Sequence, residues 1–394
     1  MVFAVLVCMV TSSDAAVDAY SRYRSFSQGS RVLGEHHSTD LAVSLSHYAM
    51  GVIYDNDLKA SQAVKEFEAS CILEPNVSYI HTRLALDYLL LKKPERALGE
   101  VATAKRLDPS DPKPMFVAAL IYTSQNKFED ARKEYQEAIH LDPDSIWALS
   151  SLADIYVVQE KMSEAAVIYE KLIEKNPESD LLYFNLGIIY TRLGKIDKGI
   201  EALNRATQLS PEYLEAYIGL GVMYEMNKDI EKAVTNFKKA LEIDPNYART
   251  YFYLGVLYGE MKEKVQSEKY FRDAIRIDPK FADAYNYLGY MFAEDGVRLD
   301  EAVDLTKKAV ELDPDNGAFM DSLGWALFKK GMTEEASVQI LKALKNYPDD
   351  PTVRDHMGDI YYKKGLHDKA VEEWNKSLEF DPKQDKVRQK LKER

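Results

Sequence analysis

Cysteine and histidine are scarce in this chain of 394 residues, and the few that occur have no spacing typical of a reactive or metal-binding site. The two cysteines, Cys8 and Cys71, provide no disulfide framework, so cysteine usage does not indicate a compartment. The seven histidines include no pair with the spacing of a helical zinc site that has an intervening glutamate. Nucleophile elbows, phosphate-binding loops and paired catalytic cysteine and histidine motifs are also missing. We therefore expect a protein that is not an enzyme and that holds no metal or cofactor.

The chain also lacks the excess of basic residues that nucleic acids require. It has 64 acidic and 51 basic residues, which gives a formal net charge of −13. Because the phosphates of nucleic acids are bound by basic tracks, nucleic acid is not an expected partner. The acidic excess predicts a well-solvated surface or, as an alternative, a preference for basic partners.

The first ten residues, MVFAVLVCMV, are apolar but too short to cross a bilayer as a stable helix. They resemble the apolar core of a secretory signal, and small residues follow at Ser13 and Ala15, although the usual basic residues before the core are missing. An exported or periplasmic location is therefore slightly favoured over a cytoplasmic one. Membrane association is expected only through this N-terminus.

Proline, in contrast, recurs at regular intervals along most of the chain. Ten of the 14 prolines follow one another in steps of 34 residues, with a single step of 35. They are Pro75, Pro109, Pro143, Pro177, Pro211, Pro245, Pro279, Pro314, Pro348 and Pro382. A period of this length is typical of a stacked-repeat solenoid, in which each repeat contacts its neighbours. Such proteins present a long surface to other molecules, so we expect recognition rather than catalysis.

Other positions of the repeat agree with the proline phase when the proline is numbered 32. Position 8 is Gly or Ala in every repeat, position 20 is small, position 11 is nearly always aromatic and position 24 is mostly large. Because these residues are three to four apart within two segments, each repeat is expected to be a pair of helices that approach closely at the small residues. Gly194, Gly296, Gly331 and Gly365 are expected to end first helices in a left-handed conformation.

This pattern resembles the tetratricopeptide repeat (TPR) family over residues 44–384. The resemblance implies an all-α fold, a right-handed α-α superhelical solenoid of about ten repeats. Residues 1–43 are then expected to contain the signal-like segment and a flexible lead-in, with Ser38-Thr39-Asp40 capping the first helix. Residues 385–394 are rich in basic residues and have apolar residues four apart, so we expect a short helix that caps the last repeat.

In the family, the first helices line the concave side of the solenoid, so positions 5 and 9 are expected to face a binding groove. The predicted partner-binding residues of repeats 5 to 10 are Phe184, Ile188, Ile218, Val222, Phe252, Val256, Tyr290, Asp321, Trp325, Asp355 and Asp359. This groove would be apolar and aromatic at its centre and acidic toward its C-terminal end. The alternative is that these side chains pack against neighbouring helices.

Two recognition modes of the family are disfavoured by residue type. A carboxylate clamp uses Lys at position 5 and Asn at position 9, which no repeat here has. The sugar-transferring members have a ladder of Asn at position 6, where this chain has only Asn185. The stretch from Asn286 to Ala336, with DSLGWALFKKGM, resembles the C-terminal repeats of bacterial exported or lipoprotein-type TPR proteins. That resemblance implies a role in assembling envelope or polysaccharide-export components.

The leading hypothesis is a non-catalytic bacterial scaffold that binds protein or peptide segments in its concave groove. Two alternatives stay open: a regulatory subunit of a separately encoded enzyme, and a self-assembling coat protein. The identity of the partner cannot be read from this chain.

Overall fold

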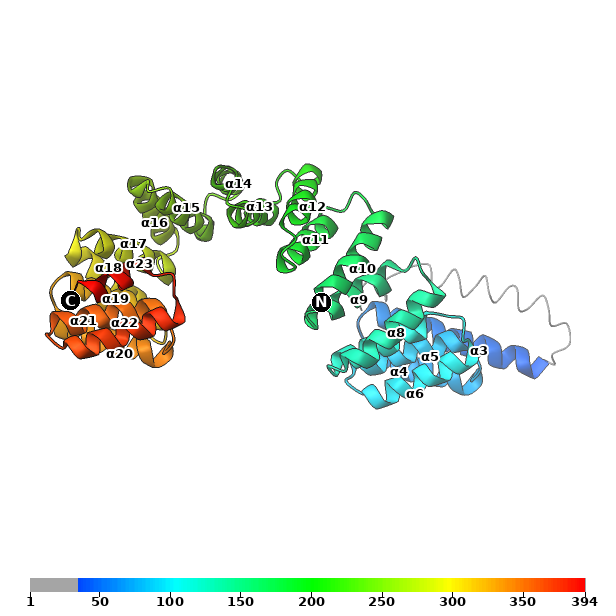
Figure 1. The fold of residues 1–394 in the computed structure, drawn as a ribbon. Helices are drawn as coiled ribbons and strands as arrows, with labels where there is room; N and C mark the ends of the chain where they lie inside the picture. The colour runs from blue at the N-terminus through cyan, green and yellow to red at the C-terminus, as the bar shows by residue number, and fades with distance from the viewer. Residues whose placement is uncertain (1–34, 394) are drawn as a thin grey trace. The chain divides into compact units, whose positions relative to one another are not determined.

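The structure, a computed structural model, describes residues 35–393, with side chains from residue 40 onward. These residues form 21 α-helices joined by short turns, and no strand occurs among them (Figure 1). The expected all-α repeat fold is therefore confirmed. The apolar run of residues 1–10 and the small residues Ser13 and Ala15 lie outside the described part of the chain.

The chain divides into two compact units, residues 1–202 and 203–394, and the division falls inside α12 (Ile196–Leu209). The other described helices of the first unit are α3 (Glu35–Asn56), α4 (Ala60–Leu73), α5 (Ser78–Leu90), α6 (Pro94–Leu107), α7 (Lys113–Ser124), α8 (Phe128–Leu141), α9 (Ile146–Val158), α10 (Met162–Lys175) and α11 (Asp180–Arg192). The helices that lie wholly in the second unit are α13 (Leu214–Met226), α14 (Ile230–Ile243), α15 (Ala248–Glu260), α16 (Lys264–Ile277), α17 (Ala282–Asp295), α18 (Leu299–Leu312), α19 (Gly317–Lys329), α20 (Thr333–Asn346), α21 (Pro351–Lys363), α22 (His367–Phe380) and α23 (Asp385–Lys392).

Within each repeat, a small residue of the first helix packs against a large side chain of the second. A Cβ atom at Gly221 would lie 2.6 Å from the ring of Phe237, and one at Gly255 would lie 2.6 Å from the ring of Phe271. Both rings are buried, so they cannot move away without opening the core. Positions 8 and 24 therefore meet across the helix pair, as their spacing predicts.

The turn between the two helices of a repeat contains a left-handed residue. Gly194, Gly296, Gly331 and Gly365 have φ angles of +66° to +89°, which confirms the role that the sequence assigned to them. In the other six repeats a residue with a side chain takes the same conformation: Leu58, Lys92, Asn126, Glu160, Lys228 and Lys262. The tight turn is thus imposed by the packing of the two helices even where the local residue disfavours it.

The acidic residue before the repeat proline has its own structural role. In the second unit, a carboxylate oxygen of Asp244 accepts a hydrogen bond from the backbone N–H of Asn246 at 2.9 Å, and Asp278 does the same for Lys280 at 2.9 Å. These turns close directly after α14 and α16. The proline cannot continue the helix, and the aspartate stabilises the turn that follows.

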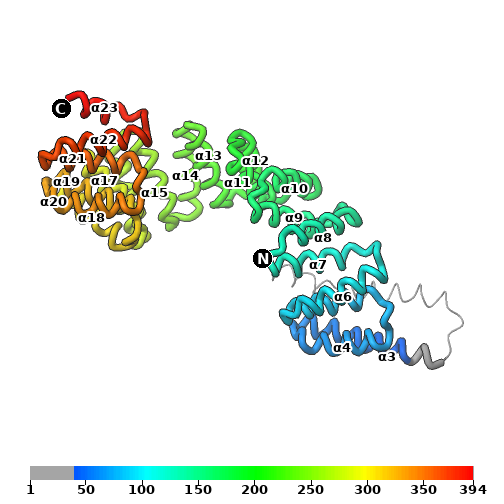
Figure 2. The backbone as a smooth tube through the Cα atoms, turned by 60° about the horizontal axis from the view of Figure 1, so that its bottom comes forward, coloured from blue at the N-terminus to red at the C-terminus, as the bar shows by residue number. Residues whose placement is uncertain are grey.

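The two ends of the described chain differ in how well the sequence predicted them. Helix α3 begins at Glu35, so Ser38-Thr39-Asp40 lie inside a helix, and the prediction that they cap its start is wrong. At the other end, α23 lies beside α22 (Figure 2). Its Val387 is buried against Trp374, which covers the apolar side of the last helix pair.

Candidate binding groove

The predicted groove residues lie on the first helices of the last six repeats. Phe184 and Ile188 are on α11 in the first unit, where both side chains are half-buried. The other nine predicted residues are in the second unit, on α13, α15, α17, α19 and α21. In two stretches of this second unit, the side chains at positions 5 and 9 differ in their burial and in their contacts. We call residues 214–277 the open stretch and residues 282–392 the filled stretch.

In the open stretch, the predicted residues Ile218, Val222, Phe252 and Val256 are all half-buried. Ile218 and Val222 pack at the margin of a core that contains Phe237. Phe252 and Val256 pack at the margin of a second core that contains Phe271 and Trp325. Each of the four side chains keeps part of its surface exposed to water. Together they form an apolar surface that a bound partner could bury further.

Phe252 is the best supported of the four side chains. Its ring lies 5.2 Å from that of Phe281 and 5.1 Å from that of Tyr287, both in edge-to-face geometry, and 5.8 Å from that of Phe271. Tyr287 itself is 45% exposed. Such contacts fix the Phe252 ring, so a partner would meet an ordered aromatic surface.

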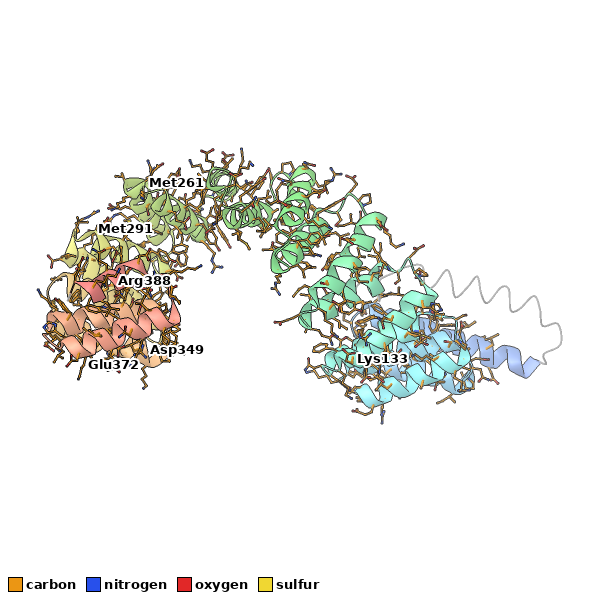
Figure 3. All side chains as sticks on the ribbon, in the orientation of Figure 1. Lys133, Met261, Met291, Asp349, Glu372 and Arg388 are labelled. Atoms are coloured by element: carbon orange, nitrogen blue, oxygen red, sulfur yellow. The ribbon has the colours of Figure 1, made fainter. Side chains whose placement is uncertain are left out.

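A pocket with a volume of about 630 Å³ adjoins this surface between the ends of α13 and α15 (Figure 3 labels its Met261). The lining residues are Val222, Glu225, Met226, Lys228, Ile230, Glu260 and Met261. The pocket therefore combines apolar side chains with two carboxylates. Only Val222 of this group was predicted from the sequence.

In the filled stretch, the predicted anchor Trp325 is only 7% exposed. Its indole ring stacks on the imidazole of His356 at 4.0 Å, with 13° between the planes, and on Phe328 at 5.3 Å. The indole Nε1–H donates a hydrogen bond to Glu294 at 2.7 Å. Because its polar atom and its ring are both engaged within the chain, Trp325 is a packing residue here.

Asp321, at the other predicted position of α19, is also buried and forms an ion pair with His356. The distances from His356 Nδ1 to the two carboxylate oxygens are 2.9 and 3.1 Å. Burial acts to lower the pKa of His356, but the negative charge and hydrogen bond of Asp321 outweigh it, and the net effect is a raised pKa. The raised pKa favours the imidazolium form of this buried histidine, which lies between a carboxylate and the Trp325 ring.

Helix α23 supplies the cation for the last predicted pair, Asp355 and Asp359 on α21. Lys390 Nζ lies 2.7 and 2.9 Å from the oxygens of Asp355 and 2.7 Å from Asp359. Trp374 also donates to Asp359 at 3.2 Å. Burial raises the pKa of Asp359, which Lys390 opposes. The chain itself thus pairs the expected acidic end of the groove with one cation, which offsets part of its negative charge.

Tyr290, the remaining predicted residue, is half-buried beside the same network. Its ring lies 6.5 Å from that of His356. Burial raises the pKa of Tyr290, and the nearby carboxylate of Glu294 adds to the effect. Sequence reasoning missed His356, Glu294 and Lys390. The only indication in the sequence was spacing: each of these residues lies 31 to 35 residues, about one repeat, from the groove position that it contacts.

The first unit contains a buried carboxyl pair that the sequence did not reveal. Asp55 and Asp87 are both buried, and Arg83 Nη1 lies 3.4 Å from Asp55 Oδ2. One oxygen of each carboxyl group has no hydrogen-bond partner in the described structure. Burial raises the pKa of Asp87 well above its ordinary value, and the neighbouring Asp55 carboxyl adds to the effect. The close pairing of the two buried carboxyl groups therefore favours a state in which a proton is bound.

The fold also brings Cys71 close to His81, a pairing that no sequence motif indicated. The distance from Cys71 Sγ to His81 Nδ1 is 3.9 Å. The contact with Cys71 and the hydrogen bond to Glu100 raise the pKa of His81 to about 10. His81 Nδ1 lies 2.6 Å from Glu100 and Nε2 lies 3.0 Å from the carbonyl oxygen of Pro75. Both ring nitrogens therefore donate, and the imidazolium serves as a structural link rather than a base for the thiol.

Two further features bear on possible functions. In the described part of the chain, no three His, Cys, Asp or Glu side chains are placed so that they could hold a metal ion. None of the helices of residues 35–393 has both the length and the apolar character needed to cross a bilayer.

Sequence comparison supports the repeat assignment directly. Family models described as TPR repeat or tetratricopeptide repeat match residues 119–160, 147–179, 168–201, 227–262, 248–281, 266–317 and 352–384. Together these ranges include more than half of the chain. No curated protein matches the chain significantly in sequence.

Solved structures share the architecture. The Cut9–Hcn1 hetero-tetramer of the APC/C is 14% identical with a TM-score of 0.51, over 91% of this chain and 98% of that one. The C-terminal part of a TPR repeat-containing protein from Cytophaga hutchinsonii is 17% identical with a TM-score of 0.54, over 60% of this chain and 97% of that one. YrrB, described as a TPR protein with an unusual peptide-binding site, is 26% identical with a TM-score of 0.41, over 47% of this chain and 95% of that one. The repeat matches and the series of helix pairs show that this chain belongs to the tetratricopeptide repeat family.

Proposed function

We propose that this protein is a non-catalytic scaffold that binds segments of partner proteins on the first helices of its open stretch. One observation carries the proposal. Ile218, Val222, Phe252 and Val256 remain half-buried beside a pocket, whereas the equivalent positions Asp321 and Trp325 of the filled stretch are buried by contacts within the chain. Apolar surface that the chain leaves partly unused is what a partner segment can bury.

A more specific proposal concerns the cellular location of the protein and the assembly in which it takes part. The signal-like residues 1–10 and the resemblance of Asn286–Ala336 to exported TPR proteins support a bacterial envelope protein that assembles polysaccharide-export or other envelope components. Fractionation of native cells and N-terminal sequencing of the purified protein test this proposal. An intact Met1 in a cytosolic fraction would contradict it.

The scaffold proposal is tested by affinity capture with the full chain, followed by binding measurements on the purified partner. We expect Phe252→Ala and Val222→Ala to weaken binding, by about tenfold for Phe252, because aromatic anchors on concave surfaces dominate binding energies. Phe380→Ala and Val265→Ala are the matched controls, since both residues lie on second helices, α22 and α16, and are 43% and 82% exposed.

The outcomes separate the proposal from its alternatives. If the control variants weaken binding as much as Phe252→Ala and Val222→Ala, the first helices of the open stretch are not the binding surface. If the partner is an enzyme whose rate changes on binding, the chain is a regulatory subunit. If light scattering shows growth of the pure chain with concentration, self-assembly is the better description.

A further inference from the structure

We propose that the pocket between α13 and α15 holds a basic side chain, lysine or arginine, of the partner segment. The inference rests on the proposed function and adds the chemistry of the partner to it. It follows from three features of the pocket: apolar walls, two carboxylates without a cationic partner, and a size suited to a long side chain.

The walls fit the aliphatic part of such a side chain. Val222 of α13 and Ile230 of α14 are half-buried, and Met226 and Met261 on the rim are 47% and 40% exposed. Methionine side chains are flexible and adapt to the shape of an apolar ligand. A lysine or arginine stem would bury these side chains while its charged end stays near the rim.

Glu225 of α13 and Glu260 of α15 supply the negative charge. Some carboxylates of the open stretch are paired within the chain: Glu268 lies 2.9 Å from Arg272, and Asp229 lies 2.7 Å from Lys232. Among the described residues, no basic side chain forms an ion pair with Glu225 or Glu260, although Lys228 also lines the pocket. These two acids are therefore available to a cation from outside.

The two carboxylates also disfavour each other's charge. Burial raises the pKa of Glu225, and the like charge of Glu260 raises it further. A cation between them removes this repulsion, whereas an anionic ligand would increase it. The chain's formal net charge of −13 also favours the approach of a basic segment.

The experiment uses n-butylguanidinium as the probe and the full chain labelled at its methionine methyl groups. We expect saturable NMR shifts at Met226 and Met261 at tens of millimolar, about the affinity range of so small a fragment. Pentanoate and 1-pentanol test the requirement for positive charge.

The double variant Glu225→Gln, Glu260→Gln should weaken binding by about fivefold, the upper range for a partly exposed ion pair. Glu212→Gln, an exposed glutamate ahead of α13, is the matched control.

The possible outcomes are distinct. Equal shifts with 1-pentanol, no saturable shift with the cation, or undiminished binding in the double variant would each overturn the inference. Concentration-dependent association that the double variant abolishes would show that a second copy of this chain, not a separate partner, occupies the pocket. If partner binding depends on Val222 but the pocket takes no cation, this inference fails alone. If the pocket takes the cation but partner binding does not depend on Phe252 or Val222, the proposed function fails instead.

Discussion

The open and filled stretches of the second unit are built from the same repeat but use its groove positions for different purposes. In the open stretch, positions 5 and 9 carry Ile218, Val222, Phe252 and Val256, which are half-buried and have no polar group to satisfy. In the filled stretch, Asp321 and Trp325 at these positions are buried and engaged within the chain, and the half-buried Asp355 and Asp359 are paired with Lys390. The repeat fixes where a side chain points, and the neighbouring repeats decide whether a partner can reach it.

The difference has a direct physical origin. An aliphatic side chain on a groove helix gains little from a neighbour one repeat away unless the helices approach closely. A tryptophan or a charged side chain spans that gap, because ring stacking and ion pairs join Trp325 to His356 and Lys390 to Asp355. Trp325, His356 and Lys390 therefore engage the groove positions of the filled stretch within the chain, whereas Phe252, which also contacts the next repeat, stays half-buried.

The largest effect is expected for Trp325→Ala. Removing this buried ring should lower the free energy of unfolding by about 3–5 kcal/mol, since it leaves a cavity and an unpaired Glu294. Phe252→Ala, the matched aromatic of the open stretch, should cost clearly less because its ring is only half-buried. Urea unfolding followed by circular dichroism measures both. Equal losses would mean that the two stretches do not differ as described.

The second prediction concerns the pH dependence of the filled stretch. Because the pKa of His356 is raised in the folded chain, its ion pair with Asp321 stabilises fully below the unfolded pKa, near 6.5, and is lost as pH rises through the folded pKa. The free energy of unfolding should fall in that range by up to about 1.4 kcal/mol per pH unit. His356→Asn should flatten this part of the curve. An unchanged slope in the variant would show that His356 does not titrate as inferred.

The third prediction tests whether α23 closes the groove. Lys390→Met removes the cation from Asp355 and Asp359, so we expect a loss of about 1–2 kcal/mol in unfolding free energy. Lys386→Met, on the exposed side of the same helix, is the control and should change little. If both variants lose the same amount, the effect comes from net charge rather than from the bridge.

The fourth prediction compares the turns of the two stretches. The filled stretch has a left-handed glycine in each of its three turns within repeats, with Arg298 as an additional left-handed residue, whereas the open stretch has Lys228 and Lys262 with φ angles of +59° and +62°. Lys262→Gly should raise the free energy of unfolding by up to about 1 kcal/mol, because it relieves the backbone strain but adds freedom to the unfolded chain. Gly331→Lys should lower the melting temperature, because it introduces the same backbone strain. A loss of stability in Lys262→Gly would show that its side chain contributes more than its backbone costs.

The smallest effect is expected for Glu225→Gln. It removes like-charge repulsion with Glu260 without emptying any packed space, so the free energy of unfolding should stay within about 0.5 kcal/mol of the wild-type value. Thermal melting at neutral pH checks this expectation. A large loss would mean that Glu225 holds the pocket in shape, and the pocket would then be a structural feature.

The sequence predicted the fold well because the repeat positions report contacts inside one helix pair. A glycine at position 8 closely approaches the residue at position 24 of the same repeat, as with Gly221 and Phe237 or Gly289 and Thr306. The candidate site was harder to predict. Position 9 reads Val222 in one repeat and Trp325 in another, and helical spacing places both on the same face although only one is buried.

The sequence by itself determined the helix pairs, the turn at each repeat proline and the glycines that end first helices. These features depend on contacts within about 34 residues, and the residues that make those contacts recur in ten successive repeats. Only the tertiary structure decided which groove positions stay accessible and that Glu225 and Glu260 share a pocket. That decision depends on the approach of first helices from successive repeats and on side chains such as His356 and Lys390, which cross from one repeat to the next. Side-chain length and charge at a single position set these contacts, so the average pattern of the repeat does not reveal them.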